Sequence, residues 1–381
     1  MNIVGFAWPE IVYLSPRAPG GPVPNLPDDI LFSAQFVLVD GKFRGLFTLL
    51  FGASLLLFVE RADARGEGGI TLQLRRLSFL ALFGLAHFFL LWWGDILFLY
   101  AVCGFAVLGM IDWEARTLIR RALIIYAVGT AWLLASNLPA ALPWFLPGVE
   151  GHQATQRLVE QFDRAAQAET ALALGPWTTR LADSVFNHWQ QPLVTVANYA
   201  LETIPLMMFG MALLKDGFFA GAWDTARYRR WAWRGIAGGL VLTLPLAWWQ
   251  WREEFALQVV FLVGLALALP GRLAMTLGFA ALLVPLARSA PASWLGERII
   301  AAGRMAFSNY IGTSLAMAFI FQGWGLAYFA RYTRVELLGF VVLGWLLMLA
   351  WSRPWLERYR QGPLEWLWRS LVRRRREPFR R

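Results

Sequence analysis

The stretch GLAHFFLLWWGDILFLYA, residues 84–101, is almost entirely hydrocarbon and aromatic, yet it contains His87 and Asp95. Similar apolar blocks recur along most of the 381 residues, of which 58% are hydrophobic and only 16% charged. Soluble domains are nearer one quarter charged, and about 20 apolar residues suffice to span a bilayer core. The sequence therefore predicts an all-α fold, a polytopic bundle of transmembrane helices that forms a single membrane-embedded domain over residues 1–381.

The net charge of +10 and the single cysteine limit which binding partners and metal sites the chain can be expected to have. A basic balance can indicate nucleic-acid binding, but in so apolar a chain the excess of arginine and lysine in cytoplasmic loops explains it better. We therefore expect membrane lipids as partners and no nucleic acid. Cys103 cannot form an internal disulfide, and it lacks the companions of a cysteine-based metal site, so no metal site is predicted.

Proline and glycine residues and the local composition divide the chain into apolar blocks and three other segments. Residues 15–29 are rich in proline and glycine and predict a loop. Residues 141–192 predict an outer, periplasmic loop with an amphipathic surface helix near 153–170. Residues 353–381 predict a basic cytoplasmic tail whose interfacial helix contacts anionic lipid headgroups. The apolar blocks are 44–60, 77–93, 95–112, 122–140, 193–214, 235–251, 254–271, 273–287, 305–323 and 335–352.

Basic residues gather in loops 61–76, 113–121 and 215–234 and in the C-terminal tail, which predicts that all four face the cytoplasm. Two apolar blocks separate each of these loops from the next, as this orientation requires. Five blocks then precede the tail, and an odd number of crossings would place the tail outside. Because the tail has the densest charge, we expect one block not to span, and we expect either a re-entrant pair or one merged, tilted helix over 254–287.

Four motifs resemble those of the YeiB-like family (DUF418), bacterial inner-membrane proteins of unsettled activity. These motifs are GKFRGLFTLLFG at 41–52, the stretch 75–101, GRMAFSNY at 303–310 and GPLEWLWRSL at 362–371. The resemblance implies about ten helices in the full family and an inner-membrane location. Family members begin with a full first helix, of which Met1 and Asn2 look like the end, so we expect a first helix that is truncated here, most simply through a misplaced start.

His87 and Asp95 are predicted catalytic residues with different surroundings. A histidine inside a membrane helix marks a functional site by default, and an imidazole can serve as a general base or proton carrier; the alternative is a histidine satisfied within the bundle. Gly84, on the same helix face, allows close approach of a neighbouring helix. Asp95 follows Gly94 and is a favoured N-cap, so we expect it at a turn near water. The two side chains can pair only if the chain folds back at Gly94.

Charged residues in two other blocks predict further site residues. Lys42 and Arg44 lie at the outer mouth of block 44–60, where basic groups are disfavoured, so we expect an anionic partner: Asp40, a lipid phosphate or an anionic group of a substrate. Glu202 lies four residues after Asn198 in a deep apolar block and should pair with an arginine or histidine across the bundle. Acid catalysis and proton coupling are both open roles for Glu202.

The motif GRMAFSNY adds Arg304, Asn309 and Tyr310 as predicted substrate-binding residues, with hydrogen bonds between helices as the alternative. The family's fold is distantly similar to that of membrane acyltransferases, including the heparan glucosaminide acetyltransferase group. This likeness implies acyl or small-group transfer at or across the membrane, with a donor such as acyl-CoA entering from the cytoplasmic side. A proton-coupled transporter or lipid-handling protein, and a structural membrane protein without chemistry, are the alternatives.

Overall fold

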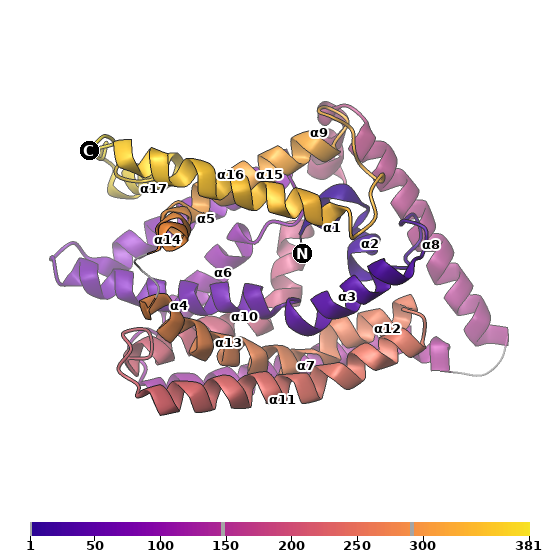
Figure 1. The fold of residues 1–381 in the computed structure, drawn as a ribbon, viewed down its shortest axis with the longest axis horizontal. Coiled ribbons are helices and arrows are strands. Elements are labelled where there is room, and N and C mark those ends of the chain that lie inside the picture. The colour runs from indigo at the N-terminus through magenta and orange to yellow at the C-terminus, as the bar shows by residue number, and fades with distance from the viewer. Residues whose placement is uncertain (1, 146–148, 290–292) are drawn as a thin grey trace.

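The computed structural model describes residues 2–145, 149–289 and 293–381, and it is built from α-helices, as the sequence predicts. Most of the long helices run along the same direction, as Figure 1 shows. The helices are α1 (Ile3–Ala7), α2 (Glu10–Leu14), α3 (Leu26–Leu38), α4 (Lys42–Asp63), α5 (Gly69–Leu90), α6 (Leu97–Leu108), α7 (Ala115–Phe145), α8 (Val149–Leu174), α9 (Trp177–Phe186), α10 (Gln191–Lys215), α11 (Thr225–Arg252), α12 (Leu257–Leu262), the π-helical η1 (Val263–Leu267), α13 (Leu269–Ser289), α14 (Trp294–Arg304), α15 (Ala306–Phe321), α16 (Leu337–Arg358) and α17 (Pro363–Arg373).

Six helical segments in the described ranges are long and apolar enough to cross a membrane: 26–63, 69–90, 115–145, 191–215, 269–288 and 337–358. Many of their large apolar side chains point away from the protein, including Val128 and Trp132 on α7 and Leu346 on α16. An apolar surface of this extent is unstable in water but is favourable against lipid. The protein is therefore a multi-pass membrane protein.

Two segments differ from the sequence expectation. The predicted loop at 15–29 ends earlier, because Asn25 caps α3 by accepting from the N–H of Asp28 and Pro27 suits the first helical turn. The blocks 254–271 and 273–287 form the consecutive segments α12, η1 and α13, so the merged helix is the correct alternative. Between the loop after α10 and the C-terminal tail, α13 and α16 are long and apolar enough to cross a membrane, whereas α15 is shorter, so the number of crossings there stays a prediction.

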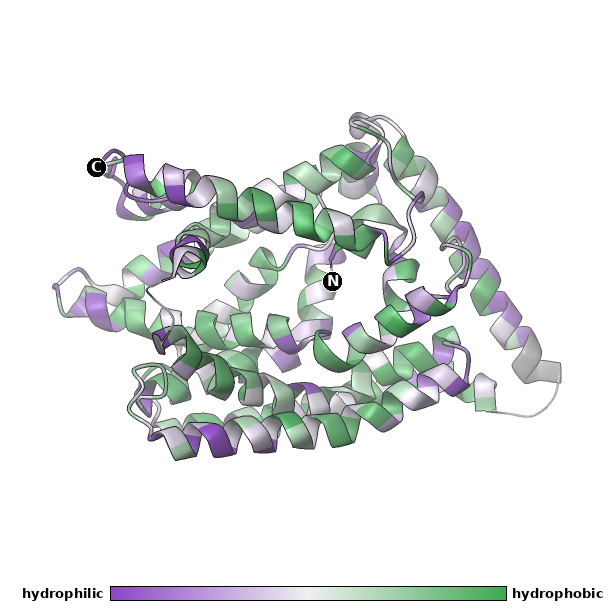
Figure 2. Cartoon of the chain, in the orientation of Figure 1, coloured by the Kyte–Doolittle hydropathy of each residue, from purple (hydrophilic) through white to green (hydrophobic). Residues whose placement is uncertain are grey.

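Basic segments gather at one end of the bundle, which we call the arginine-rich end. It comprises the α4–α5 turn, the α6–α7 and α10–α11 loops and the C-terminal tail (Figures 1 and 2). Lys215 donates to the carbonyl of Ile111 at 2.7 Å, and the Trp368 indole donates to the carbonyl of Arg76 at 3.0 Å, so these loops touch. The predicted sidedness therefore fits the grouping of the loops.

The opposite end is covered by α8, the amphipathic helix expected near 153–170. Its residues Phe162, Ala166 and Ala173 join an apolar cluster with Val12 of α2. The backbone N–H of Glu10 donates to the Glu169 carboxylate at 2.8 Å, and burial raises the pKa of Glu169 to about 7. The amphipathic helix expected in segment 141–192 thus packs against the bundle through these residues of α8.

Glycines allow a very close crossing of α4 and α10. A Cβ at Gly210 would lie 2.0 Å from the Leu49 carbonyl oxygen, and one at Gly52 would lie 2.1 Å from that of Met207. Only glycine allows two backbones to approach this closely. The crossing fixes how the outer half of α4 faces the first half of α10.

We expect Gly210→Ala to lower stability by about 1–3 kcal/mol, because the added methyl group must separate two backbones that have no slack. The thermal unfolding midpoint of the purified protein in detergent measures this loss. Gly339→Ala on α16 is the matched control, since nothing lies within 4 Å of its Cβ position. Equal midpoints for the two variants would show that the α4–α10 crossing is not tightly packed.

Candidate functional site

His87 and Asp95 form a buried pair where the chain turns back between α5 and α6. The Nδ1 atom of His87 lies 2.9 Å from one carboxylate oxygen of Asp95, and the two side chains are 0% and 3% exposed. The other oxygen accepts from the backbone N–H of Phe98 at 2.8 Å. Asp95 therefore caps α6, as predicted, but it also binds His87. The Asp95 carboxylate is buried in the turn and not exposed to water as expected, although Trp93 and Gly94 beside it are partly exposed.

Gly84 makes this pairing sterically feasible. A Cβ at residue 84 would lie 2.3 Å from the Phe98 nitrogen and 2.8 Å from an Asp95 carboxylate oxygen. The helix that approaches Gly84 this closely is thus α6, through its first residues. The chain leaves α5 through Leu91 and Trp92, whose N–H groups both donate to the His87 carbonyl, so the fold-back begins before Gly94.

Aromatic rings enclose the His87 imidazole. The Tyr310 ring lies 4.9 Å from it and the Trp92 ring 6.4 Å, measured between ring centroids. Trp92 is itself fixed, because its indole donates to the Gly5 carbonyl and stacks on Phe6. The Nε2 atom of His87 is buried without a hydrogen-bond partner, and neither of the two cavities described below reaches it. The His87 ring is therefore packed among neighbouring side chains, and neither of these two cavities gives access to it.

With Nδ1 held by a carboxylate, the neutral imidazole is favoured in the tautomer that leaves a lone pair on Nε2. A free acceptor nitrogen of this kind can take a proton from a nucleophile, while the carboxylate stabilises the imidazolium that forms. The Tyr310 ring, which the sequence predicted to bind substrate, packs beside the His87 imidazole. The turn thus contains the components of a general base.

Arg44 and Glu202 form the second buried pair, across the α4–α10 crossing. Their side chains meet at 2.5 Å, with Glu202 4% and Arg44 20% exposed. The guanidinium also lies over the Tyr199 ring at 5.0 Å. The arginine expected opposite Glu202 is therefore Arg44, and Glu202 is the anionic partner expected for Arg44.

The backbone beside this ion pair is tied to α6. Thr48 donates to the Arg44 carbonyl at 2.8 Å, and its hydroxyl lies 2.7 Å from that of Tyr100. The sequence analysis did not identify Thr48, Tyr100 or Tyr199. Thr48 lies four residues after Arg44 and Tyr199 lies three residues before Glu202, and this helical spacing is the only signal that could have indicated these two residues. Since α6 carries Asp95 before its first turn and Tyr100 within it, this short helix joins the two pairs.

Lys42 makes its hydrogen bond to a backbone carbonyl, while the expected Asp40 acts on it only as a nearby charge. Its ammonium group is fully buried and donates to the Phe36 carbonyl at 2.5 Å, near the end of α3. The carbonyls at a helix C-terminus carry partial negative charge, so the backbone of α3 replaces the expected anion. Gly41 permits the sharp break between α3 and α4, because its φ of +72° is left-handed.

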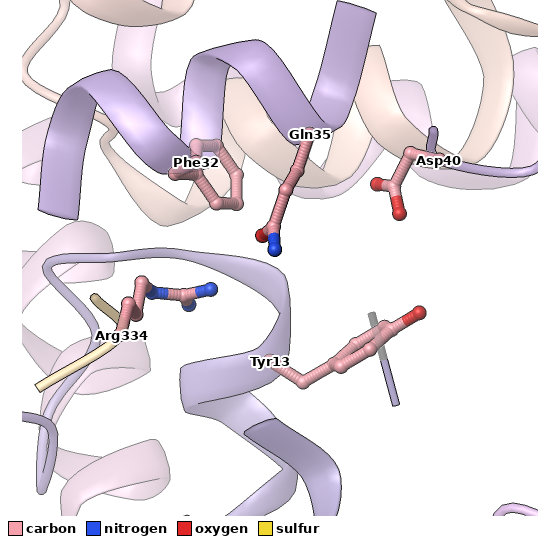
Figure 3. Close-up of a pocket in the computed structure, with 5 residues that line it drawn as sticks. All are labelled: Tyr13, Phe32, Gln35, Asp40 and Arg334. Atoms are coloured by element: carbon pink, nitrogen blue, oxygen red, sulfur yellow. The ribbon is translucent and has the colours of Figure 1, made fainter. Parts of the chain in front are cut away.

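A small polar cavity lies beside this break, lined by Tyr13, Phe32, Gln35, Asp40 and Arg334 (Figure 3). Its volume of about 10 Å³ is enough for about one water molecule. Burial and the nearby Asp40 raise the pKa of Tyr13, while Arg44 and Arg272 act in the opposite direction. The cavity therefore belongs to the same polar region as the Arg44–Glu202 pair.

Arg304 and Asn309 lie apart from both pairs. Asn309 donates to the Ala302 carbonyl and to Ser352, and its side-chain oxygen accepts from the Trp351 indole, so it joins α14, α15 and α16. Arg304 is exposed and donates to the Arg360 carbonyl at 3.3 Å. Their contacts match the alternative of hydrogen bonds between helices, and their binding role stays a prediction.

Comparison with known proteins gives the family. The model of the family "Protein of unknown function (DUF418)" matches residues 213–375. The chain is 30% identical to the uncharacterized protein YeiB of Escherichia coli (strain K12), over 98% of this chain and 91% of that protein. It is 25% identical to the uncharacterized protein YxaH of Bacillus subtilis (strain 168), over 98% and 90% respectively. No solved structure matches. The agreement with YeiB over nearly the whole length of both chains shows that this membrane protein belongs to the DUF418 family.

Proposed function

We propose that the protein is a membrane-embedded group-transfer enzyme that moves an acyl group, with His87 as general base. One observation carries the proposal: Nδ1 is held by Asp95 while the buried Nε2 has no partner. A buried polar atom without a partner is costly, and a proton acceptor at an active site is one reason for a protein to keep it. Acyl transfer matches this arrangement because its nucleophile must lose a proton.

In the proposed reaction, Nε2 takes the proton from a hydroxyl or amine of the acceptor as that group attacks the donor's thioester carbonyl. The carbon–sulfur bond then breaks, and the imidazolium returns the proton to the departing thiolate. Asp95 holds the ring and stabilises its charged form. The rings of Tyr310 and Trp92 must separate from His87 to admit the reacting groups, as with active sites that open only to bind substrate.

We expect His87→Ala to lower acyl-CoA turnover at least about 100-fold, because a positioned general base contributes about 10²–10⁴-fold. The assay measures release of free thiol from acetyl-CoA or palmitoyl-CoA by the protein in lipid nanodiscs. The protein's own thiol interferes little, since Cys103 is the single cysteine and is buried. Asp95→Asn keeps a capping side chain but removes the carboxylate charge, so it should also lose turnover.

His188→Ala is the control for this assay, since His188 is largely exposed. It should leave thiol release unchanged. Thiol release by the native protein no faster than by empty nanodiscs, or full activity in His87→Ala, would rule out the proposed chemistry.

The buried Arg44–Glu202 pair favours a second function, proton-coupled transport, in which Glu202 is protonated and freed from Arg44. Glu202→Gln should then abolish proton-dependent uptake in vesicles while thiol release is unaffected. It should also destabilise the protein by about 3–5 kcal/mol, because Arg44 keeps a buried charge without its partner. The double variant Arg44→Met, Glu202→Gln should recover part of this loss in the unfolding midpoint. Purely additive losses would show that the two side chains do not interact.

We further propose that the protein lies in the bacterial inner membrane with the arginine-rich end, including the C-terminus, in the cytoplasm. The positive-inside bias supports this orientation. In a Cys103→Ser background, Asp163→Cys on α8 should react with an impermeant maleimide added to intact spheroplasts, while Arg376→Cys should react only after lysis. The reverse pattern of labelling would invert the topology.

A further inference from the structure

The C-terminal helix α17 is docked on the bundle and does not simply lie on a membrane surface. One carboxylate oxygen of Glu365 accepts from the backbone N–H groups of Phe307 (2.8 Å) and Ser308 (3.0 Å), and the other accepts from the Ser308 hydroxyl. Glu365 therefore caps the start of α15 from a neighbouring helix. Trp368 adds its hydrogen bond to the Arg76 carbonyl, so α17 holds a fixed position against α5 and α15.

This docking forms one wall of the larger cavity, an open groove of about 500 Å³ between α17, the end of α4 and the start of α5. Its size is that of a typical small-molecule site. The lining combines apolar side chains with basic ones around a single carboxylate. The lining residues are Ser54, Leu57, Phe58, Arg61, Arg65, Arg76, Glu365, Trp368, Arg369, Val372 and Arg373.

The charges of the lining do not balance. Glu365 is occupied by α15, and Glu67 on the α4–α5 turn binds both Arg65 (2.9 Å) and Arg373 (3.4 Å). In the described part of the chain, no carboxylate lies within salt-bridge distance of Arg61, Arg76 or Arg369. Arg76 and Arg369 also repel each other. None of these three guanidinium groups thus forms a direct ion pair, although Glu377 attracts Arg369 from a greater distance, and planar guanidinium groups match phosphate oxygens in geometry.

The apolar part of the lining indicates what carries that phosphate. Leu57 and Phe58 belong to the apolar span of α4, and the Arg76 guanidinium lies between the rings of Phe58 and Trp368, 4.9 and 4.8 Å from their centroids. A hydrocarbon chain fits along this wall, and the cavity is far larger than a phosphate ion. Charged groups at the end of an apolar span form the pattern that recognises a lipid at its headgroup.

We propose that this cavity binds one anionic phospholipid from the leaflet at the arginine-rich end. Its phosphate lies among Arg61, Arg76 and Arg369, and an acyl chain follows Leu57 and Phe58. The sequence predicted contact between the tail helix and anionic headgroups in general, whereas the cavity defines a single site with named ligands. The site is separate from His87 and Glu202, so it stands whether or not the proposed chemistry is correct.

Native mass spectrometry of the delipidated full-length protein tests the site. Titration with phosphatidylglycerol should show one lipid bound more tightly than the others, and phosphatidylcholine should bind at least tenfold more weakly. The double variant Arg61→Gln, Arg369→Gln should weaken the phosphatidylglycerol site at least tenfold. Arg376→Gln is the matched control, because this arginine is exposed and outside the lining; it should bind as the native chain does.

Equal affinity for the two lipids, or equal affinity of the double variant and Arg376→Gln, would overturn the proposal. Competition arms distinguish the source of the phosphate: inorganic phosphate and glycerophosphoglycerol should fail to displace the lipid at millimolar concentration. Displacement by either would identify a site for a soluble phosphate compound and refute the lipid assignment. The unfolding midpoint of the double variant, measured without lipid, should equal that of Arg376→Gln. A lower midpoint for the double variant than for Arg376→Gln would show that Arg61 and Arg369 hold α17 in place. That result would count against the proposal that these two arginines serve to bind the lipid.

Discussion

The structure depends on burying the Asp95 carboxylate inside the bundle. An unpaired carboxylate in a membrane interior is costly, and Asp95 avoids this cost by accepting from two donors, the Phe98 N–H and the His87 ring. Both donors can reach Asp95 because α6 begins inside the protein. With 12 residues it is about 18 Å long, too short to cross a bilayer core of about 30 Å. The short length of α6 therefore follows from the same buried start that lets Asp95 accept from the first turn of α6 and bind His87.

Other buried charges in the bundle are also neutralised at helix breaks or crossings. Lys42 uses the carbonyl that α3 exposes near its end, and Arg44 meets Glu202 where α4 and α10 cross. Arg334, in the connection before α16, donates to the Val12 carbonyl, while its own N–H binds Asp28. Interrupted helices thus supply the polar partners that lipid cannot. They also concentrate the polar groups in one region, which is where a substrate would find charge inside a membrane.

Periodicity and composition predicted the helical membrane fold well, because an apolar run of sufficient length leaves few alternatives in lipid. They missed α3, whose first turn contains Pro27, Asp28 and Asp29 and resembles a loop. One of these acids is satisfied by distant groups: Asp28 accepts from the N–H groups of Arg334 and Val335, more than 300 residues away. The partner of Lys42 was equally hidden, since a backbone carbonyl has no sequence signature. The sequence indicated a close approach at Gly84 and a fold-back as the condition for pairing His87 with Asp95, but it did not show that the approaching helix is α6 itself.

The first turn of α15 joins the two ends of the molecule. Its N–H groups at Phe307 and Ser308 depend on Glu365 of α17, and the Phe307 ring packs on both Trp368 and Phe83. Tyr310, one turn further, packs on His87. On α5, Arg76 and His87 are 11 residues apart, which is three turns and about 16 Å on one face. Tyr310, one of the rings that close over His87, thus stands on one of the two helices that hold α17, so a movement of α15 that separates Tyr310 from His87 would shift the turn that Glu365 caps. An acyl-transfer site at His87 and a lipid under α17 would therefore be mechanically coupled through α15.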